Sequence, residues 1–136
     1  MKRDFFKLQL IILLAAILGC LPGYSQHSSP SPDLSGTWVG ETIVPDAGQT
    51  DEVILVLQKS KAGYTGTITD TMGLIPEVEI EDVTFEDNTL IFTFIATTGY
   101  ETITVSMNLT YEEGRLVGYW QTDDGTSGDI EFQKKE

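Results

Sequence analysis

The feature that most constrains the fold is an alternation of apolar and polar side chains along most of the chain after residue 36. It is most regular over residues 101–111, where Ile103, Val105, Met107 and Leu109 share one parity and the positions between them are polar. A period of two is typical of a β-strand with one buried and one solvated face. The sequence therefore predicts an all-β domain.

Eight segments of this kind follow one another, joined by short connections that are mostly polar or glycine-containing. Short connections make consecutive strands antiparallel neighbours. Closing the sheet into a barrel removes the two edges that an open sheet exposes. The predicted fold class is thus an all-β, eight-stranded antiparallel up-and-down β-barrel. The predicted strands are residues 37–44, 52–59, 64–70, 77–86, 89–96, 101–111, 115–122 and 129–134.

The connections alternate between tight turns and longer loops. In an up-and-down meander, alternate connections lie at the same end, so the longer loops are expected to surround the mouth of the barrel. The tight turns are residues 60–63, 87–88 and 112–114, and the longer loops are 45–51, 71–76, 97–100 and 123–128.

Individual residues refine this prediction. Trp38 lies at the start of the first strand, two residues after Gly36, and a ring of that size is suited to plugging one end of a barrel. The apolar parity changes within residues 77–86, which predicts a β-bulge near Glu81 and Asp82. Gly66 and Gly118 fall at inward parity, where a missing side chain relieves crowding or permits a sharp bend.

The first 25 residues are typical of an export signal. A charged start precedes an apolar run from Leu8 to Leu18, which is too short to span a bilayer as a helix. Two cleavage hypotheses stand. Residues 17–20 resemble a bacterial lipobox, in which the signal ends at 19 and Cys20 is lipidated, whereas residues 23–25 resemble an ordinary signal-peptidase site. Residues 26–34 are predicted to be a disordered linker, followed by a barrel domain over 35–136.

Composition excludes several classes of function. Eight basic residues against 21 acidic ones give a net charge of −13, which disfavours contact with nucleic acid or with an anionic membrane surface. The only cysteine, Cys20, lies in the signal segment and the only histidine, His27, lies in the linker. The domain therefore has no metal site of the His/Cys type and no nucleophile activated by a histidine.

The meander that begins Gly36-Thr37-Trp38 after a short leader resembles the calycin group, which includes the lipocalins and avidins. It is most similar to the small lipocalin-like domains of exported bacterial proteins, over residues 35 to 136. In lipocalins a basic residue near the last strand packs on the tryptophan, and the resemblance implies Lys134 or Lys135 for this part. A later threonine-aspartate motif and a helix after the barrel have no counterpart. The resemblance implies that the barrel binds a small apolar molecule.

A ligand inside such a barrel would touch aromatic and aliphatic side chains. The alternative is that these side chains only fill the interior, because an eight-stranded barrel can be packed solid. The predicted ligand-binding residues of the interior and mouth are Trp38, Tyr64, Met72, Leu74, Phe92, Phe94, Met107 and Trp120.

Two apolar features lie outside the predicted core. The loop 71–76 is unusually apolar and acts either as a lid or plug on the mouth or as a contact surface. Four apolar side chains share the outer face of the first two strands and form a candidate interface for a homodimer or a docking partner. They are Val39, Ile43, Ile54 and Val56.

No catalytic residue and no metal site are predicted. The acidic glycine turn 123–129, even with Asp46, Asp51 and Asp70 nearby, matches no calcium-loop spacing. The pattern places Glu77, Glu79 and Glu81 on the outer face, and no acidic pair is expected in a dry cleft.

We therefore expect an exported protein without a cofactor, in the cell envelope or secreted, whose membrane contact is limited to a lipid on Cys20. Its expected function is the non-enzymatic binding of a small hydrophobic ligand. The alternative is an interaction module with a packed core, acting through the outer patch or the 71–76 loop.

Overall fold

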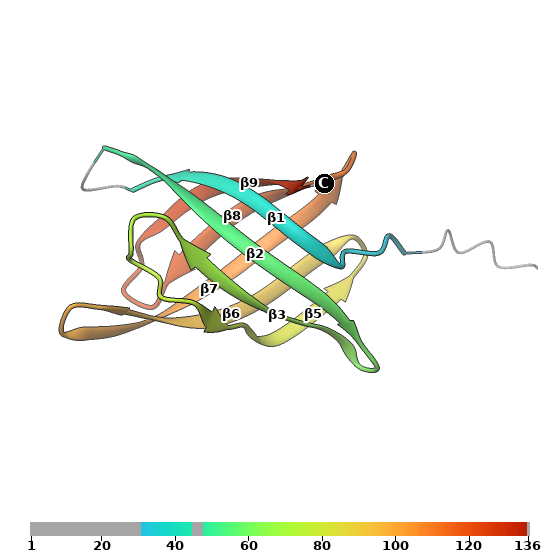
Figure 1. Ribbon diagram of the computed structural model, residues 1–136, viewed down its shortest axis with the longest axis horizontal. Helices are drawn as coiled ribbons and strands as arrows, with labels where there is room; N and C mark the ends of the chain where they lie inside the picture. The colour runs from blue at the N-terminus through green and yellow to red at the C-terminus, as the bar shows by residue number, and fades with distance from the viewer. Residues whose placement is uncertain (1–30, 45–47, 136) are drawn as a thin grey trace, which may run out of the picture. The chain divides into compact units, whose positions relative to one another are not determined.

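The computed structural model describes residues 31–44 and 48–135, shown in Figure 1. The predicted signal segment with Cys20 lies outside the described residues, as do residues 26–30 of the predicted linker. Within the described part of the chain, no helix is long and apolar enough to cross a membrane.

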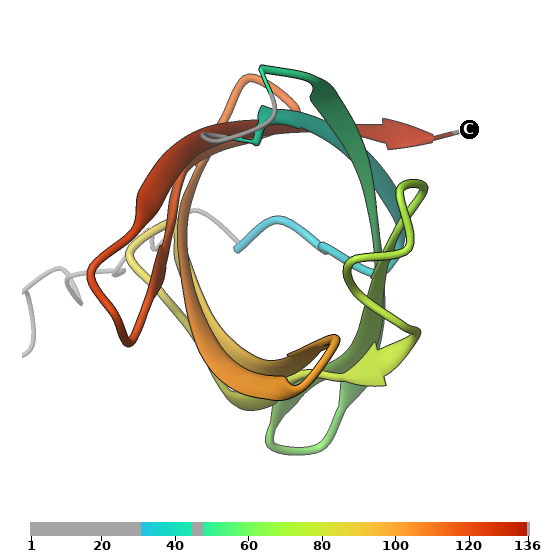
Figure 2. The same cartoon turned by 90° about the vertical axis from the view of Figure 1, so that its left-hand side faces the viewer.

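The described residues form one antiparallel sheet of nine strands that curls into a nearly closed barrel (Figures 1 and 2). β1 pairs with both β2 and β9, which joins the first strand to the last. This confirms the predicted barrel class. The strands are β1 (Gly36–Ile43), β2 (Thr50–Ser60), β3 (Gly63–Asp70), β4 (Val78–Glu79), β5 (Glu81–Glu86), β6 (Thr89–Thr98), β7 (Glu101–Glu112), β8 (Arg115–Thr122) and β9 (Ser127–Lys135).

The count is nine rather than the predicted eight because the segment 77–86 is divided at Ile80. Its first part, β4, pairs with β3, and its second part, β5, pairs with β6. The register shifts between Glu81 and Thr84, and Asp82 has a positive φ of 52°. This irregularity lies where the change of parity predicted a bulge. It lets one segment change partners and bring the two sheet edges together, and the N–H of Ile80 donates to the carbonyl of Gly66 (3.0 Å).

Two inward glycines allow neighbouring strands to approach closely. A Cβ on Gly66 would lie 1.9 Å from the carbonyl oxygen of Val56 on β2, and a Cβ on Gly118 would lie 1.9 Å from that of Asn108 on β7. Both obstacles are backbone atoms, which cannot rotate away. The absence of a side chain is therefore a requirement of the strand geometry at both positions.

Trp38 closes the end of the barrel that carries the tight turns. Its indole is almost fully buried, and its Nε1 donates to the carbonyl of Leu34 (2.9 Å). The hydroxyl of Tyr64 accepts a hydrogen bond from the Leu34 N–H (3.0 Å). Lys134 pairs with Trp38 in the β1–β9 register, and its Nζ lies 5.8 Å from the ring centroid, so Lys134 rather than Lys135 packs on the tryptophan.

The domain begins earlier than the sequence predicted. The sequence pattern predicts Leu34 in a disordered linker, yet its side chain is 0% exposed and belongs to the core. The described unit starts at Ser31. A single leucine among serines and prolines carries no periodicity, so the sequence pattern gave no sign that it is buried.

Replacing Leu34 by alanine tests this boundary. Because the side chain is fully buried beneath Trp38, Leu34→Ala is expected to reduce the free energy of unfolding by about 2–5 kcal/mol, measured by urea denaturation of the full chain. Ser31→Ala, at an exposed position in the same segment, should change it by less than about 0.5 kcal/mol. An equally small effect of Leu34→Ala would return residues 31–34 to the linker.

The close approach at Gly66 gives a second prediction. Gly66→Ala is expected to destabilise the barrel by about 1–3 kcal/mol or more, because the new methyl group must displace the β2 backbone. The exposed neighbour on the same strand provides the control, Thr65→Ala. If both variants unfold at the same urea concentration, β2 and β3 are not in contact as described.

Candidate functional site

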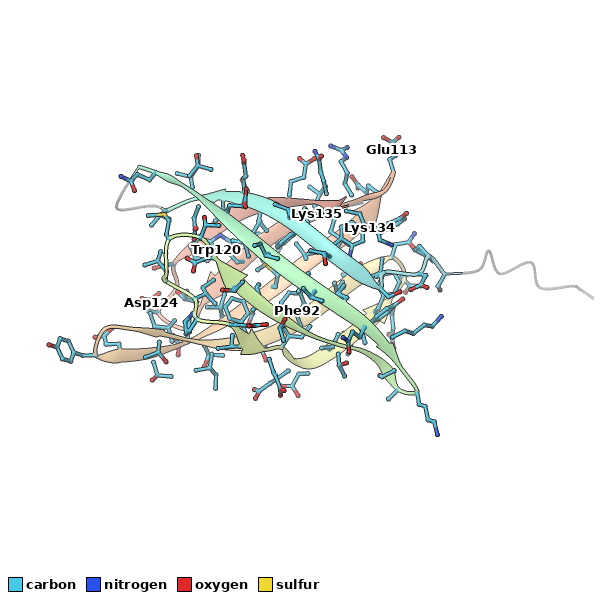
Figure 3. The ribbon with its side chains drawn as sticks, in the orientation of Figure 1. Phe92, Glu113, Trp120, Asp124, Lys134 and Lys135 are labelled. Atoms are coloured by element: carbon cyan, nitrogen blue, oxygen red, sulfur yellow. The ribbon has the colours of Figure 1, made fainter. Side chains whose placement is uncertain are left out.

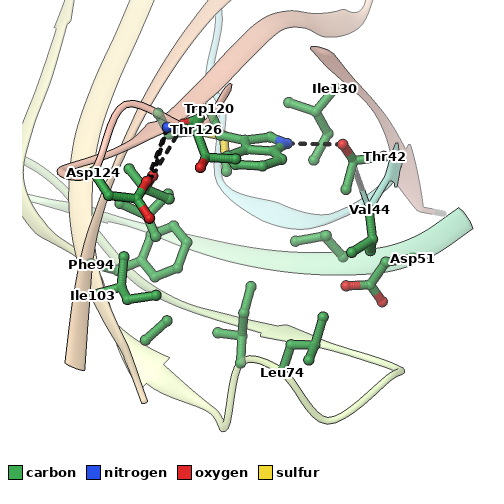
Figure 4. Close-up of a pocket in the computed structure, with 16 residues that line it drawn as sticks. Thr42, Val44, Asp51, Leu74, Phe94, Ile103, Trp120, Asp124, Thr126 and Ile130 are labelled. Carbon is green, nitrogen blue, oxygen red and sulfur yellow. Dashed lines mark hydrogen bonds between the residues drawn. The ribbon is translucent and has the colours of Figure 1, made fainter. Parts of the chain in front are cut away.

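A cavity of about 320 Å3 opens at the end of the barrel that carries the longer loops (Figure 4). Its walls come from strands far apart in the sequence and from the loop 71–76. The sequence predicted a mouth at this end. The lining residues are Thr42, Val44, Asp51, Val53, Leu74, Ile75, Phe94, Ala96, Ile103, Val105, Met107, Trp120, Thr122, Asp124, Thr126 and Ile130.

Cross-strand pairs build the apolar wall. Phe94 on β6 faces Val105 on β7, and Met107 on β7 faces Trp120 on β8. Ala96, one step nearer the mouth than Phe94, faces Ile103. Because alternate residues of a strand point to the same side, these residues all project inward. The short side chain of Ala96 leaves space that a larger residue would fill.

Hydrogen bonds fix the indole of Trp120 in this wall. Its Nε1 donates to the Thr42 hydroxyl oxygen (2.8 Å), and that hydroxyl donates to the carbonyl of Asp129 (2.8 Å). The ring also lies against Gly128, where a Cβ would be 2.7 Å from it. The polar edge of the indole is thus satisfied within the protein, and its face remains available to the cavity.

The loop 71–76 lies at the rim of the mouth, and two carboxylates hold it there. Asp70 accepts hydrogen bonds from the backbone N–H groups of Leu74 (3.0 Å) and Ile75 (2.8 Å). Asp51 accepts one from Met72 (3.3 Å). Leu74 and Ile75 consequently line the cavity, whereas a role of this apolar loop as a lid, a plug or a contact surface stays a prediction.

Asp51 is the unusual ionisable group of the site. It points inward from β2, is only 3% exposed and lines the cavity. Burial, together with the hydrogen bond and the charge of the neighbouring Asp70 carboxyl, raises its pKa from an ordinary 3.8 to about 6. The expectation that no acidic pair lies in a dry cleft is therefore wrong. The weak signal in the sequence was the inward parity of Asp51 with Val53 and Leu55.

The pKa of Asp124 is shifted in the opposite direction to that of Asp51, although both carboxyl groups line the same cavity. Hydrogen bonds from the Thr122 hydroxyl and from the backbone N–H of Thr126 (3.0 Å) lower its pKa. The carboxylate is therefore ionised at neutral pH. Figure 4 shows Asp124 near Phe94 and Ile103, and Asp51 near Val44 and Leu74 on another side of the cavity.

The predicted ligand-binding residues divide into two groups. Phe94, Met107, Trp120 and Leu74 line the cavity. The remaining four do not, and the ligand contact predicted for them is not supported by their position. Trp38 and Phe92 are buried away from the cavity lining, Tyr64 packs on Phe85 at the closed end, and Met72 is 39% exposed in the loop.

The alternation of side chains along a strand could not by itself separate the residues that line the cavity from those that do not. It separates inward from outward positions, but it does not show how far along the barrel the interior is filled. The polar lining residues, Thr42, Asp51, Thr122, Asp124 and Thr126, were missed as ligand contacts because they lie at strand ends and in loops, where polar residues are common.

The four residues of the candidate interface lie on the outer side, as their parity predicted. Val39 pairs directly with Ile54 across β1 and β2, and Val56 pairs with Thr37. These three are partly buried by their neighbours, whereas Ile43, near the mouth, is 66% exposed. A partner for this face stays a prediction.

Within the described residues, no group of three or more His, Cys, Asp or Glu side chains is placed to hold a metal ion. Asp46, considered with the acidic turn, lies outside the described residues. The fold and the cavity define the chain as an antiparallel β-barrel that is filled at one end and hollow at the other. Comparison with protein-family models, curated proteins and solved structures finds no match.

The raised pKa of Asp51 predicts how stability depends on pH. Because folded Asp51 holds its proton up to about pH 6 and the unfolded residue loses it near 3.8, this group makes stability fall as pH rises between these values. Asp51→Asn removes that contribution. At pH 7.5 the variant should be more stable than the parent by at least about 1 kcal/mol, and at pH 4 the difference should shrink.

Urea denaturation at the two pH values measures the effect, with Glu52→Gln as the control because Glu52 is the exposed neighbour of Asp51. A variant that is destabilised equally at both pH values would contradict the assignment of a buried, protonated Asp51.

Proposed function

We propose that this protein binds a small hydrophobic ligand in the cavity at the mouth of the barrel, without catalysing a reaction. The observation that carries the proposal is the cavity itself, with its mainly apolar wall of side chains such as Phe94, Met107 and Trp120. An interior designed only for packing has few voids larger than a water molecule.

The size of the cavity limits the ligand. Small-molecule sites usually measure about 300–1,000 Å3, and the volume of about 320 Å3 lies at the lower end. A single short chain or one or two rings suits this volume better than a large lipid. The loop 71–76, held by Asp51 and Asp70, supplies a cover that can shield the ligand from water.

The distribution of packing supports ligand binding over the packed-core alternative. The closed half of the barrel is filled by buried side chains that include Trp38, Phe92 and Leu34. The mouth half encloses the cavity, whose wall includes large side chains such as Phe94 and Trp120 together with the short Ala96 and Thr42. A module that acted only through its outer patch would have no need of this empty space.

Export and the calycin resemblance belong to the same proposal. An export signal that ends at residue 19, with Cys20 lipidated, or at residue 25 would place the barrel in the cell envelope or outside the cell. A binding protein in either place would collect or carry a small apolar compound.

Filling the cavity tests the proposal. Ala96→Phe adds a ring to the cavity wall, and we expect it to weaken binding of a neutral apolar probe, octan-1-ol, by about 10-fold or more because the ring occupies the ligand's space. Calorimetric titration of the full chain measures the affinity. Thr97→Phe adds the same ring at the adjacent, exposed position and should leave the affinity unchanged.

Failure of the parent protein to bind octan-1-ol, or equal binding by the Ala96→Phe variant, would contradict a ligand site in this cavity. Circular dichroism of both variants shows whether the barrel is retained.

A further inference from the structure

We infer that the ligand of this cavity carries a protonated amine on its apolar body, and that the carboxylate of Asp51 recognises the amine. This inference rests on the proposed function and specifies the chemical class of the ligand. It follows from three independent features of the mouth: the ionisable groups of the cavity wall, the distribution of basic residues over the barrel, and the burial of Asp51.

Only carboxyl groups provide charge at the cavity wall. Among its lining residues, Asp51 and Asp124 are ionisable, and no lysine, arginine or histidine of the described chain is part of the lining. Asp70 lies beside Asp51 and adds a third carboxyl at the mouth. A ligand carboxylate or phosphate would be repelled here, whereas an ammonium group would be attracted.

Basic side chains lie at the opposite end of the barrel. The described residues contain five, and all occur near the tight turns or at the end of β9 that pairs with the start of β1. Figure 3 shows Lys134 and Lys135 on the side away from Asp124 and Trp120. The electrostatic potential at the mouth is therefore negative, because no basic side chain of the described residues lies near enough to offset the carboxyl groups. Such a potential concentrates cations from solution. The five are Lys59, Lys61, Arg115, Lys134 and Lys135.

Asp51 is held as a hydrogen-bond acceptor within the wall. Its Oδ1 accepts a long 3.3 Å bond from the Met72 N–H, the backbone of Thr71 and the carboxyl of Asp70 also hydrogen-bond to it, and none of these partners is a cation. The side chain is 3% exposed. A carboxylate has about four lone-pair positions and an ammonium has three donors. An ionised, buried carboxylate without a cationic partner is unfavourable, and an ammonium in the cavity would provide that partner.

The groups around Asp51 determine how binding depends on pH. On β1 it faces Thr42, on β3 it meets Asp70, and the covering loop presents the Met72 N–H. Asp124 lines the cavity as well, whereas Glu41 and Glu52 are exposed on the outer face. None of these groups is basic, so the proton on Asp51 competes directly with a ligand ammonium.

The raised pKa of Asp51 gives the direction of this competition. Because Asp51 is largely protonated below about pH 6, affinity for an alkylammonium should rise between pH 5 and pH 7.5. An alkylammonium keeps its own charge throughout this range, since amines of this type titrate near pH 10.

Three probes with the same eight-carbon chain test the inference: octylammonium, octan-1-ol and octanoate. Each is titrated calorimetrically into the full-length protein at pH 7.5 and pH 5. We expect octylammonium to bind about 10-fold more tightly than octan-1-ol at pH 7.5, the size of effect typical of a charged hydrogen bond. Octanoate should bind most weakly, and the preference for octylammonium should diminish at pH 5.

Two variants that each remove one negative charge show which carboxylate recognises the ammonium group. Asp51→Asn should bring the ratio of octylammonium to octan-1-ol affinity close to one. Glu52→Gln, on the outer face of the same strand, should leave the ratio unchanged. Ala96→Phe distinguishes the cavity from the acidic outer surface, because octylammonium bound only to that surface would bind this variant as well as the parent.

The outcomes separate this inference from the proposed function. If none of the three probes binds, both fail. If octan-1-ol binds as tightly as octylammonium, or octanoate binds equally well, the cavity is an apolar site and the amine inference is overturned. The inference is also overturned if Asp51→Asn and Glu52→Gln have the same effect on the affinity ratio, or if Ala96→Phe retains octylammonium binding.

Discussion

The indole of Trp38 occupies the closed half of the barrel, and the position of this ring determines where empty volume remains. A barrel of this size has an interior that side chains can just fill. Here Trp38, Leu34, Phe92 and Phe132 are almost completely buried and belong to one core cluster. None of these four lines the cavity, which opens at the opposite end, where the wall combines large side chains such as Phe94 and Trp120 with the short Ala96 and Thr42.

Charge is also divided unequally over the barrel. The cavity wall carries carboxyl groups, whereas Arg115 and its ion-pair partner Glu131, together with the lysines, lie on the outer surface or toward the closed end. Asp51 and Asp70 serve two purposes, because they hold the apolar loop at the rim of the mouth and also give the mouth its negative potential. A change in the protonation of Asp51 therefore affects both the cover of the cavity and its electrostatics.

The sequence predicted the barrel because side-chain alternation and turn length are local properties that a strand meander records directly. It also located the irregularity near Asp82, where parity changes. It did not predict that Leu34 is core, since one leucine beside serine and proline has no period. It placed Phe92 and Phe94 together as ligand contacts, although only Phe94 reaches the cavity. It missed the buried Asp51, because depth along the barrel depends on all the strands at once and not on the parity of one.

The chain joins the barrel through Ser31 to Leu34, at the end opposite to the cavity (Figure 1). The end at which the chain joins the barrel is consequently not the end at which a ligand would enter the cavity. A surface, a carrier or a reporter protein joined ahead of Ser31 would meet the filled end and leave the mouth directed outward. The same addition at the loops around Tyr100 or Gly125 would lie beside the opening. An immobilised form of this protein would thus keep its cavity exposed to solution without any change to the barrel.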